Sequence, residues 1–212
     1  MRWHRSYDVE GSSLAQRLTV VQRLLRAALD TASPGRPIRM VSLCAGRGAD
    51  VIDVLRDHPR AGDVQARLVE LDPDLAARAR TDAATAGLDQ VEVVTGDASV
   101  SDAVADAVPA DVLLACGIFG NVSDEDVHRF VDCTPTMCAP RATVIWTRHR
   151  RPPDLTVEIR AWFGAAGFEE LEFVAPDPGG IVGVGAHRLL ADPRPFVPGE
   201  RFFTFVGDGS AS

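Results

Sequence analysis

IRMVSLCAGRGAD, residues 38–50, passes from an apolar run into a glycine-rich turn, and a helical pattern follows at 51–55. This order predicts a buried strand, a tight turn and a helix. Gly46 and Gly48 have no Cβ, so the turn can lie close to a ligand. The first N–H groups of the helix have no partner inside the helix and point into the same space. We therefore expect a ligand site at this turn, with most of the later sequence forming its walls.

The pattern on both sides of the turn predicts an α/β fold. An amphipathic helix is expected at 11–30 and a linker at 31–37. Strands and helices then alternate, with strands at 64–71, 91–94, 111–116 and 142–147 and helices after Asp72, at about 102–108, after Ser123 and after Asp154. Two last strands, 168–175 and 181–190, have no helix between them and should pair antiparallel. The sequence thus predicts a seven-stranded, mostly parallel sheet with helices on both faces and a C-terminal antiparallel hairpin.

Two terminal segments flank this core. We expect residues 1–35 to form a helical extension that packs on the main domain, 36–212. The residues before its helix are either a ragged tail or a lid that folds over a ligand, and both interpretations stay open. In the lid interpretation, Tyr7 contacts the substrate. The C-terminal residues 193–205, rich in proline and phenylalanine, are expected to be an extended segment held to the surface by its aromatic side chains.

Composition limits the classes of function. The chain has 212 residues, of which 46% are hydrophobic and 25% charged, as in a single globular domain. Its formal net charge of −8 argues against a large non-specific nucleic-acid surface, so nucleic acid is not the expected partner. No apolar run approaches the ~20 residues that span a bilayer, and the N-terminus does not resemble a secretory signal. The four cysteines lack metal-binding spacing. We expect a cytoplasmic protein with reduced thiols, no membrane segment and no metal site.

The loops that follow the predicted parallel strands are the most suggestive parts of the chain. They comprise residues 44–50, 70–72, 95–98, 116–121 and 147–153. In open α/β sheets, ligands bind beyond the carboxyl ends of the strands, where the strand order reverses. Because all five loops should lie at that one edge, together they predict a binding site.

Two acidic strand ends point to a nucleoside-bearing cofactor. Glu70 ends the second strand about 22 residues after the glycine turn, where a carboxylate can accept hydrogen bonds from both ribose hydroxyls. Asp97 and Ala98 end the third strand, where a carboxylate and a backbone N–H can meet the adenine amine and a ring nitrogen. In the alternative interpretation, Glu70 is a strand-end acid that serves solubility, and Asp97 is the aspartate of an ordinary turn.

Four segments resemble those of the class I S-adenosylmethionine-dependent methyltransferases. LCAGRGAD, 43–50, is similar to the glycine motif of that family, with Cys44 in place of the usual acid and Asp50 in place of the third glycine. LVELDP, 68–73, resembles the segment whose acid binds the ribose. GDA, 96–98, and DVLLACG, 111–117, resemble the adenine-contacting segment and the fourth strand. The resemblance covers roughly residues 36–190 and rests on the order and spacing of all four segments.

The resemblance implies a Rossmann-like fold and S-adenosyl-L-methionine as the cofactor. It implies cofactor contacts from Ala45, Gly46, Arg47, Gly48, Glu70, Leu71, Asp97, Ala98, Cys116 and Gly117. The implied reaction is an in-line transfer of the sulfonium methyl group to an acceptor, for which we expect a small molecule. Because the methyl group is already activated, the protein mainly aligns and desolvates the nucleophile.

The basic loop RHRR, 148–151, should lie beside this site. His149 is the candidate general base for a hydroxyl or amine acceptor. Arg148 is a candidate contact for an anionic acceptor, because arginine suits carboxylates and phosphates. The alternative is a solvated basic loop. Asn121 either contacts the substrate or holds its own loop in a turn.

Two other classes of function stay open. A nicotinamide-dependent oxidoreductase would use the same sheet and the same ribose acid. Its fingerprint, however, requires a glycine where this chain has Val51. A non-catalytic domain that binds S-adenosylmethionine or a partner protein is the second alternative, since the glycine motif is altered at Cys44 and Asp50.

Overall fold

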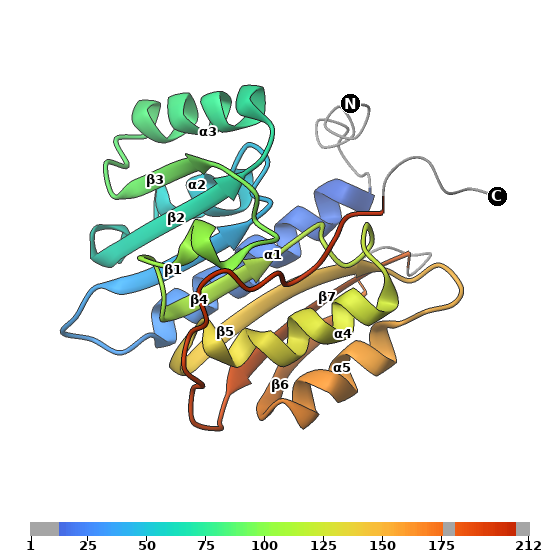
Figure 1. Ribbon diagram of the computed structural model, residues 1–212. Helices are drawn as coiled ribbons and strands as arrows, with labels where there is room; N and C mark the ends of the chain where they lie inside the picture. Colours follow the sequence, from blue (N-terminus) through green and yellow to red (C-terminus); the bar gives the residue numbers. More distant parts are fainter. Residues whose placement is uncertain (1–12, 176–180, 207–212) are drawn as a thin grey trace.

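The computed structural model describes residues 13–175 and 181–206 (Figure 1). In chain order these residues form α1 (Ser13–Thr31), β1 (Ile38–Leu43), α2 (Ala49–Leu55), η2 (Ala61–Asp63), β2 (Val64–Glu70), α3 (Pro73–Thr85), β3 (Val91–Thr95), η3 (Ser101–Val104), β4 (Ala110–Ala115), α4 (Asp124–Cys133), η4 (Thr134–Thr136), β5 (Cys138–His149), α5 (Thr156–Ala165), β6 (Phe168–Val174) and β7 (Val182–Leu189). The η elements are short 3-10 helices. Among the described residues, no helix combines the length and the apolar character needed to cross a membrane.

The seven strands form one sheet in the order β3-β2-β1-β4-β5-β7-β6. The first five run parallel, and β7 pairs antiparallel with both β5 and β6. The predicted mostly parallel sheet with a C-terminal antiparallel hairpin is therefore confirmed. The chain moves outward from β1 to β3 and then crosses back to β4, so the strand order reverses between β1 and β4. Ligands of open α/β sheets bind at such a reversal.

Helices cover both faces of the sheet, as predicted (Figure 1). Successive strand residues point to opposite faces. Met40 and Ile145 pack in one hydrophobic cluster with residues of α1, α2 and α3, whereas Val41 and Trp146 pack in the other with residues of α4 and α5. The parallel strands are buried on both sides and consequently read as continuous apolar runs.

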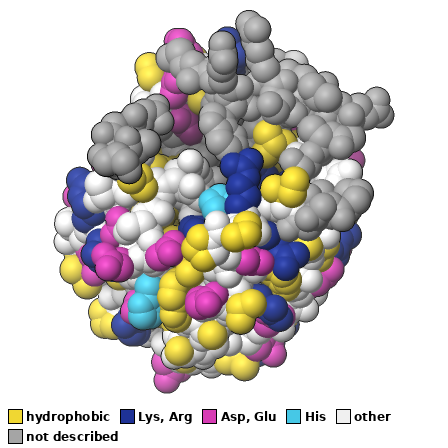
Figure 2. All heavy atoms as spheres, turned by 90° about the vertical axis from the view of Figure 1, so that its right-hand side faces the viewer, with side chains coloured by type: hydrophobic (Ala, Val, Ile, Leu, Met, Phe, Trp, Pro, Cys, Tyr) yellow, Lys and Arg dark blue, Asp and Glu magenta, His cyan; other side chains and the backbone are white. Residues whose placement is uncertain are grey.

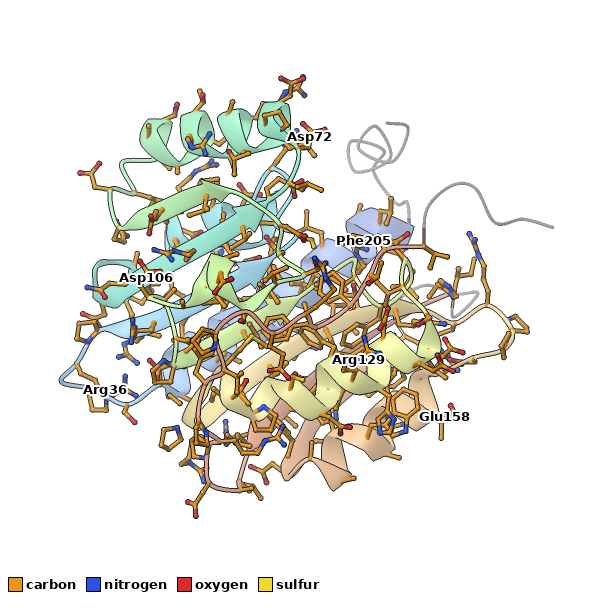
Figure 3. All side chains as sticks on the ribbon, viewed as in Figure 1. Arg36, Asp72, Asp106, Arg129, Glu158 and Phe205 are labelled. Atoms are coloured by element: carbon orange, nitrogen blue, oxygen red, sulfur yellow. The ribbon has the colours of Figure 1, made fainter. Side chains whose placement is uncertain are left out.

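The predicted helix boundaries have the expected hydrogen bonds. The side chain of Asp72 accepts bonds of 2.8 and 3.2 Å from N–H groups of the first turn of α3, whose start is labelled in Figure 3. Ser123 accepts from the first turn of α4, and Asp154 does so at the start of α5. Gly87, which follows α3, has a φ of 69°, the left-handed conformation that glycine adopts most readily. These predicted starts and this stop are confirmed.

The segment between β3 and β4 differs from the prediction. In place of a helix at about 102–108, only a 3-10 turn, η3, forms. The guanidinium of Arg39 donates to the carbonyl groups of Asp106 and Val108, so these groups bond to an arginine from β1. β5 is also longer than the predicted strand at 142–147, since it begins at Cys138 beside Ala110 of β4.

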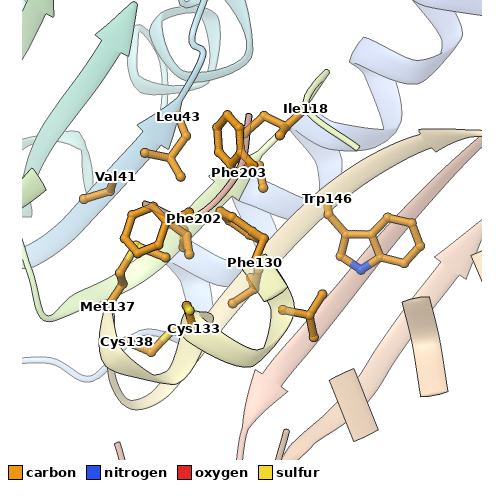
Figure 4. Packing of buried hydrophobic residues seen from close by; sticks show 14 of the residues in the cluster. Val41, Leu43, Ile118, Phe130, Cys133, Met137, Cys138, Trp146, Phe202 and Phe203 are labelled. Atoms are coloured by element: carbon orange, nitrogen blue, oxygen red, sulfur yellow. The ribbon is translucent and has the colours of Figure 1, made fainter. Parts of the chain in front are cut away.

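The C-terminal segment, residues 193–206, is more than a surface attachment, and this corrects the sequence-based expectation. Phe202 and Phe203 are fully buried, whereas Phe205 is 41% exposed. Both buried rings lie about 6 Å from the ring of Phe130 in α4. Figure 4 shows them among core residues from β1, α4 and β5. These two side chains therefore belong to the hydrophobic cluster on this face of the sheet.

Candidate functional site

Hydrogen bonds join the ends of β1, β2 and β3 into one structure at the carboxyl edge of the sheet. The N–H of Ala45 donates to the carbonyl of Val69 at 3.0 Å. The N–H of Gly96 donates to the carbonyl of Glu70 at 2.9 Å. The glycine turn, the end of β2 and the loop after β3 are thus placed side by side. The sequence predicted that these three loops would meet, and they do.

Glu70 lies at the centre of this group and is only 8% exposed. Its Oε2 accepts from the N–H of Gly46 at 2.7 Å, and its Oε1 accepts from the N–H of Asp72 at 2.9 Å. The side chain therefore fixes the glycine turn to the start of α3. A carboxylate has about four lone-pair sites, so these two bonds leave acceptor capacity for ribose hydroxyls.

The two glycines of the turn have different roles in the structure. Both have positive φ, 58° at Gly46 and 71° at Gly48, which favours glycine. A Cβ on Gly48 would lie 2.6 Å from Cδ2 of Leu68 and 3.0 Å from Cδ1 of Ile52. Gly48 is thus required for packing between the turn and β2, which the sequence did not reveal. Arg47, between the two glycines, is exposed.

Cys44 occupies the position at which the resembled family has an acid. Burial, followed by the charges of Glu70 and Asp97, raises the pKa of its thiol to about 12. The thiol is therefore neutral at physiological pH. The two carboxylates that act on it come from the ends of β2 and β3, so both predicted nucleoside-binding acids lie around the end of β1.

The predicted adenine-binding residues are partly accessible. Leu71 is 62% exposed, whereas Ala98 is buried at 4%. Oδ1 of Asp97 accepts from the N–H of Ser99 at 2.9 Å, and Oδ2 lies 3.5 Å from Arg201. Burial raises the pKa of Asp97, but hydrogen bonds from Ser99 and the charge of Arg201 outweigh this and lower it. Sequence reasoning did not single out Arg201, because it lies more than 100 residues away in the C-terminal segment.

The loop after β4 carries the residues predicted for the methionine end of the cofactor. The N–H of Gly117 donates to Oγ1 of Thr147 at 2.9 Å, which joins this loop to β5. Burial and the charge of Asp50 raise the pKa of the Cys116 thiol, so Cys116 and the start of α2 lie close together. Burial raises the pKa of Asp50 to about 6. The acid that replaces the third glycine of the motif is therefore a partly buried group at the reversal of strand order.

The structure places Arg148 and Asn121 in structural roles. Arg148 is 8% exposed, and its guanidinium donates to the carbonyl of Phe119 and to Asp124. Its contact with an anionic acceptor stays a prediction. Nδ2 of Asn121 donates to the carbonyl of Gly117 at 2.7 Å, which is the loop-holding role considered from the sequence.

His149 ends β5 and lies against the loop after β4. Its Cδ2 is 3.2 Å from the point where a Cβ on Gly120 would lie. Among the described residues, its buried Nδ1 has no hydrogen-bond partner. Burial and the charges of Arg148 and Arg151 lower the pKa of the imidazole. At neutral pH the ring is therefore neutral, which is the form a general base requires. The other predicted substrate contact, Tyr7, lies outside the described residues.

Comparisons with known proteins support the fold. No protein-family model matches the sequence, and no curated protein sequence matches it. Among solved structures, magnesium protoporphyrin IX methyltransferase from Synechocystis, with bound S-adenosylmethionine, is 12% identical with a TM-score of 0.66, and the alignment covers 89% of each chain. An RNA methyltransferase from Salinibacter ruber, in complex with S-adenosylhomocysteine, is 22% identical with a TM-score of 0.56, covering 86% of this chain and 97% of that one.

An O-methyltransferase family protein from Burkholderia thailandensis is 15% identical with a TM-score of 0.65. The alignment covers 86% of this chain and 58% of that protein. At these identities the likeness concerns the fold. The sheet order, with an antiparallel β7 between β5 and β6, agrees with it. The chain has the fold of the class I S-adenosylmethionine-dependent methyltransferases.

Proposed function

We propose that the protein binds S-adenosyl-L-methionine and transfers its methyl group to a small-molecule acceptor. The observation that carries this proposal is the position of Glu70. It is a buried carboxylate at the end of β2 that holds the glycine turn and lies beside Asp97 at the end of β3. The site is at the reversal of strand order, where a nucleoside can lie across the strand ends.

The residues at this edge suit the parts of the cofactor. Glu70 would accept from the ribose hydroxyls, and Asp97 would accept from the adenine amine, with the exposed side chain of Leu71 beside the ring. Cys116 and Gly117 would lie under the methionine part. When bound, the cofactor supplies a methyl group activated by a sulfonium charge. The protein then has to align the acceptor and exclude water.

His149 is the proposed general base. Its lowered pKa leaves the imidazole neutral near pH 7, so that it can take the proton that an acceptor hydroxyl or amine releases on methylation. Its position at the end of β5, against Gly120, places it beside the loop proposed for the methionine part.

A small acceptor fits the surface better than a nucleic acid does, with an anionic molecule as one candidate. Figure 2 shows acidic, basic and apolar side chains interspersed on the described part of the face at the right of Figure 1. The net charge of −8 disfavours a phosphate backbone as well. We propose a cytoplasmic location on the sequence features given above.

Of the two alternative functions, the sheet topology disfavours the oxidoreductase, whereas one observation favours the non-catalytic domain. An oxidoreductase of the dinucleotide-binding type is disfavoured, because its usual strand order is 3-2-1-4-5-6 and this sheet has an antiparallel β7 next to β5. A non-catalytic domain that binds the cofactor is favoured by one observation, the replacement of the motif acid by the neutral thiol of Cys44.

Calorimetric titration with S-adenosylhomocysteine, and separately with NAD(H) and NADP(H), tests the proposal. Binding of S-adenosylhomocysteine alone is the expected result. Binding of a nicotinamide nucleotide alone would favour an oxidoreductase, and binding of neither would contradict the proposed cofactor. Methyl transfer from labelled S-adenosylmethionine to a set of small hydroxyl, amine and carboxylate acceptors then separates an enzyme from a binding domain.

A further inference from the structure

The C-terminal segment (dark red in Figure 1) connects the two loops that flank the proposed cofactor site. Phe202 N–H donates to the carbonyl of Ser99 at 2.8 Å, in the loop after β3. Val206 N–H donates to the carbonyl of Asn121 at 3.0 Å, in the loop after β4. Between them, the N–H of Thr204 donates to Oδ2 of Asp126 at 3.0 Å. One short stretch thus spans the edge from the proposed adenine end to the proposed methionine end.

Arg201 is the residue of this segment that reaches the proposed adenine end. Its Nη1 donates to Oγ of Ser99 at 2.6 Å and lies 3.5 Å from Oδ2 of Asp97. The other carboxylate oxygen of Asp97 accepts from the N–H of Ser99 at 2.9 Å. Arg201 and Ser99 therefore hold the Asp97 carboxylate from both sides.

This ion pair is not needed to attach the segment to the core. The two buried rings of Phe202 and Phe203 and the backbone hydrogen bonds already do so. The side chains of Arg201 and Asp97 are 52% and 46% exposed, and ion pairs this exposed contribute little to stability. Their arrangement matters for a different reason, because a carboxylate that must accept from one particular amine needs a fixed orientation.

We propose that Arg201 is a positioning residue for adenine recognition, acting through Asp97 and Ser99. The inference rests on the proposed function. In this arrangement Arg201 and the N–H of Ser99 take part of the acceptor capacity of the Asp97 carboxylate, and the remaining lone pairs are directed to the exocyclic amine. Specificity for adenine would then depend on a residue outside the sheet and outside the four segments that resemble the family.

The test compares two nucleosides that differ at one group. S-inosyl-L-homocysteine has a carbonyl oxygen where S-adenosyl-L-homocysteine has the amine, so an aspartate acceptor discriminates against it. The dissociation constants of both are measured by calorimetry for the full chain, for Arg201→Ala and for Arg201→Lys. Arg194→Ala is the matched control, since Arg194 is an exposed arginine of the same segment whose backbone N–H, not its side chain, bonds to Pro135.

We expect Arg201→Ala to lower the preference for the adenine compound about threefold to tenfold, by weakening its binding while that of the inosine compound changes little. Arg201→Lys should restore part of the preference, because it keeps the charge but not the planar fork. Arg194→Ala should leave the preference unchanged. In Asp97→Asn, adding Arg201→Ala should change the preference no further, because Arg201 acts through Asp97.

Three results would overturn the inference. Equal weakening of both nucleosides would show that Arg201 only maintains the shape of the edge. An unchanged preference in Arg201→Ala would show that Arg201 has no role in adenine recognition. Tighter binding of the adenine compound would show that the ion pair competes with adenine. If the unsubstituted protein binds neither nucleoside, the proposed function itself fails, and this result is distinct from the other three. Thermal unfolding of each variant confirms that it is folded.

Discussion

On the nucleoside side of the edge, backbone hydrogen bonds between neighbouring strand ends join the loops, whereas on the acceptor side a side chain of β5 and the C-terminal segment hold them. The N–H groups of Ala45 and Gly96 donate to the carbonyl groups of Val69 and Glu70. By contrast, Gly117 bonds to the side chain of Thr147, and Thr204 of the C-terminal segment bonds to the side chain of Asp126. The two sides of one site are therefore built by different kinds of contact.

The two sides should therefore respond differently to substitution. The backbone bonds between the ends of β1, β2 and β3 follow the register of the parallel strands and involve no residue of the C-terminal segment. The acceptor side depends on the packing of the C-terminal segment, so a core substitution there should alter the loop after β4 as well as stability.

Phe202→Ala should destabilise the protein by about 3–5 kcal/mol, the usual cost of removing a fully buried aromatic ring. Phe205→Ala is the matched control in the same segment, and because Phe205 is 41% exposed its loss should cost far less. Urea unfolding of both variants measures the difference. Similar losses for the two would show that the segment is held at the surface and that the contrast between the two sides is wrong.

Gly48→Ala should cost about 2–4 kcal/mol, because a left-handed backbone and an overpacked Cβ both contribute. Gly35→Ala provides the control, since Gly35 also has a positive φ, 85°, but nothing lies within 4 Å of the added Cβ. It should cost only the backbone contribution, about 1–2 kcal/mol. Equal free energies of unfolding for the two variants would exclude the packing role assigned to Gly48.

Glu70→Ala should weaken binding of S-adenosylhomocysteine by about 1–3 kcal/mol, the effect of losing a charged hydrogen-bond partner. Glu92→Ala is a suitable control, because Glu92 is an exposed carboxylate of β3 that pairs with Arg67 and lies before the carboxyl end of that strand. Calorimetry gives both affinities. An unchanged affinity in Glu70→Ala would remove the ribose assignment and leave Glu70 with its turn-holding role alone.

The same contrast explains how much the sequence could reveal. Local signals were sufficient for the strands and for the caps at Asp72 and Ser123, because these depend on periodicity or on residues a few positions apart. The meeting of the three loops around Glu70 followed from the parallel sheet, in which the carboxyl ends of the strands share one edge. The antiparallel hairpin followed from the missing helix between two strands. These parts of the fold are confirmed by the structure.

Distant contacts left no local signal. The burial of Phe202 depends on packing against Phe130 of α4, which lies more than 70 residues earlier in the chain. The ion pair of Arg201 with Asp97 depends on the path of the same segment. A sequence also does not show that the guanidinium of Arg148 donates to Phe119 and Asp124, whereas its contact with an anionic acceptor stays a prediction.

The smallest predicted effect is a pH dependence of stability with opposite signs in the two halves of the sheet. His187 of β7 is buried against Phe163, accepts from Trp146 at 3.1 Å and lies 3.7 Å from Glu170. Burial lowers its pKa to about 4, against an ordinary value of about 6.5. Between these values the unfolded chain binds more protons than the folded chain, so this group makes stability rise with pH.

Asp50, beside the glycine turn, acts in the other direction. Its pKa is about 6 in the folded chain, against an ordinary value of 3.8. Between these values the folded chain binds more protons than the unfolded chain, so stability falls as the pH rises. From pH 5.5 to 7.5 the contribution of His187 is a gain of about 1 kcal/mol, which Asp50 partly offsets. Substitution separates the two contributions.

His187→Gln keeps an acceptor for Trp146. Between pH 5.5 and 7.5, the free energy of unfolding of this variant should therefore rise less, or fall more, than that of the unsubstituted protein. Asp50→Asn should make it rise more steeply. His128→Gln is the control for the loss of an exposed imidazole, because His128 is half exposed on α4. Urea unfolding at both pH values measures each slope. A common slope in all four proteins would mean that neither His187 nor Asp50 titrates in this window, and that the two halves of the sheet do not differ in this respect.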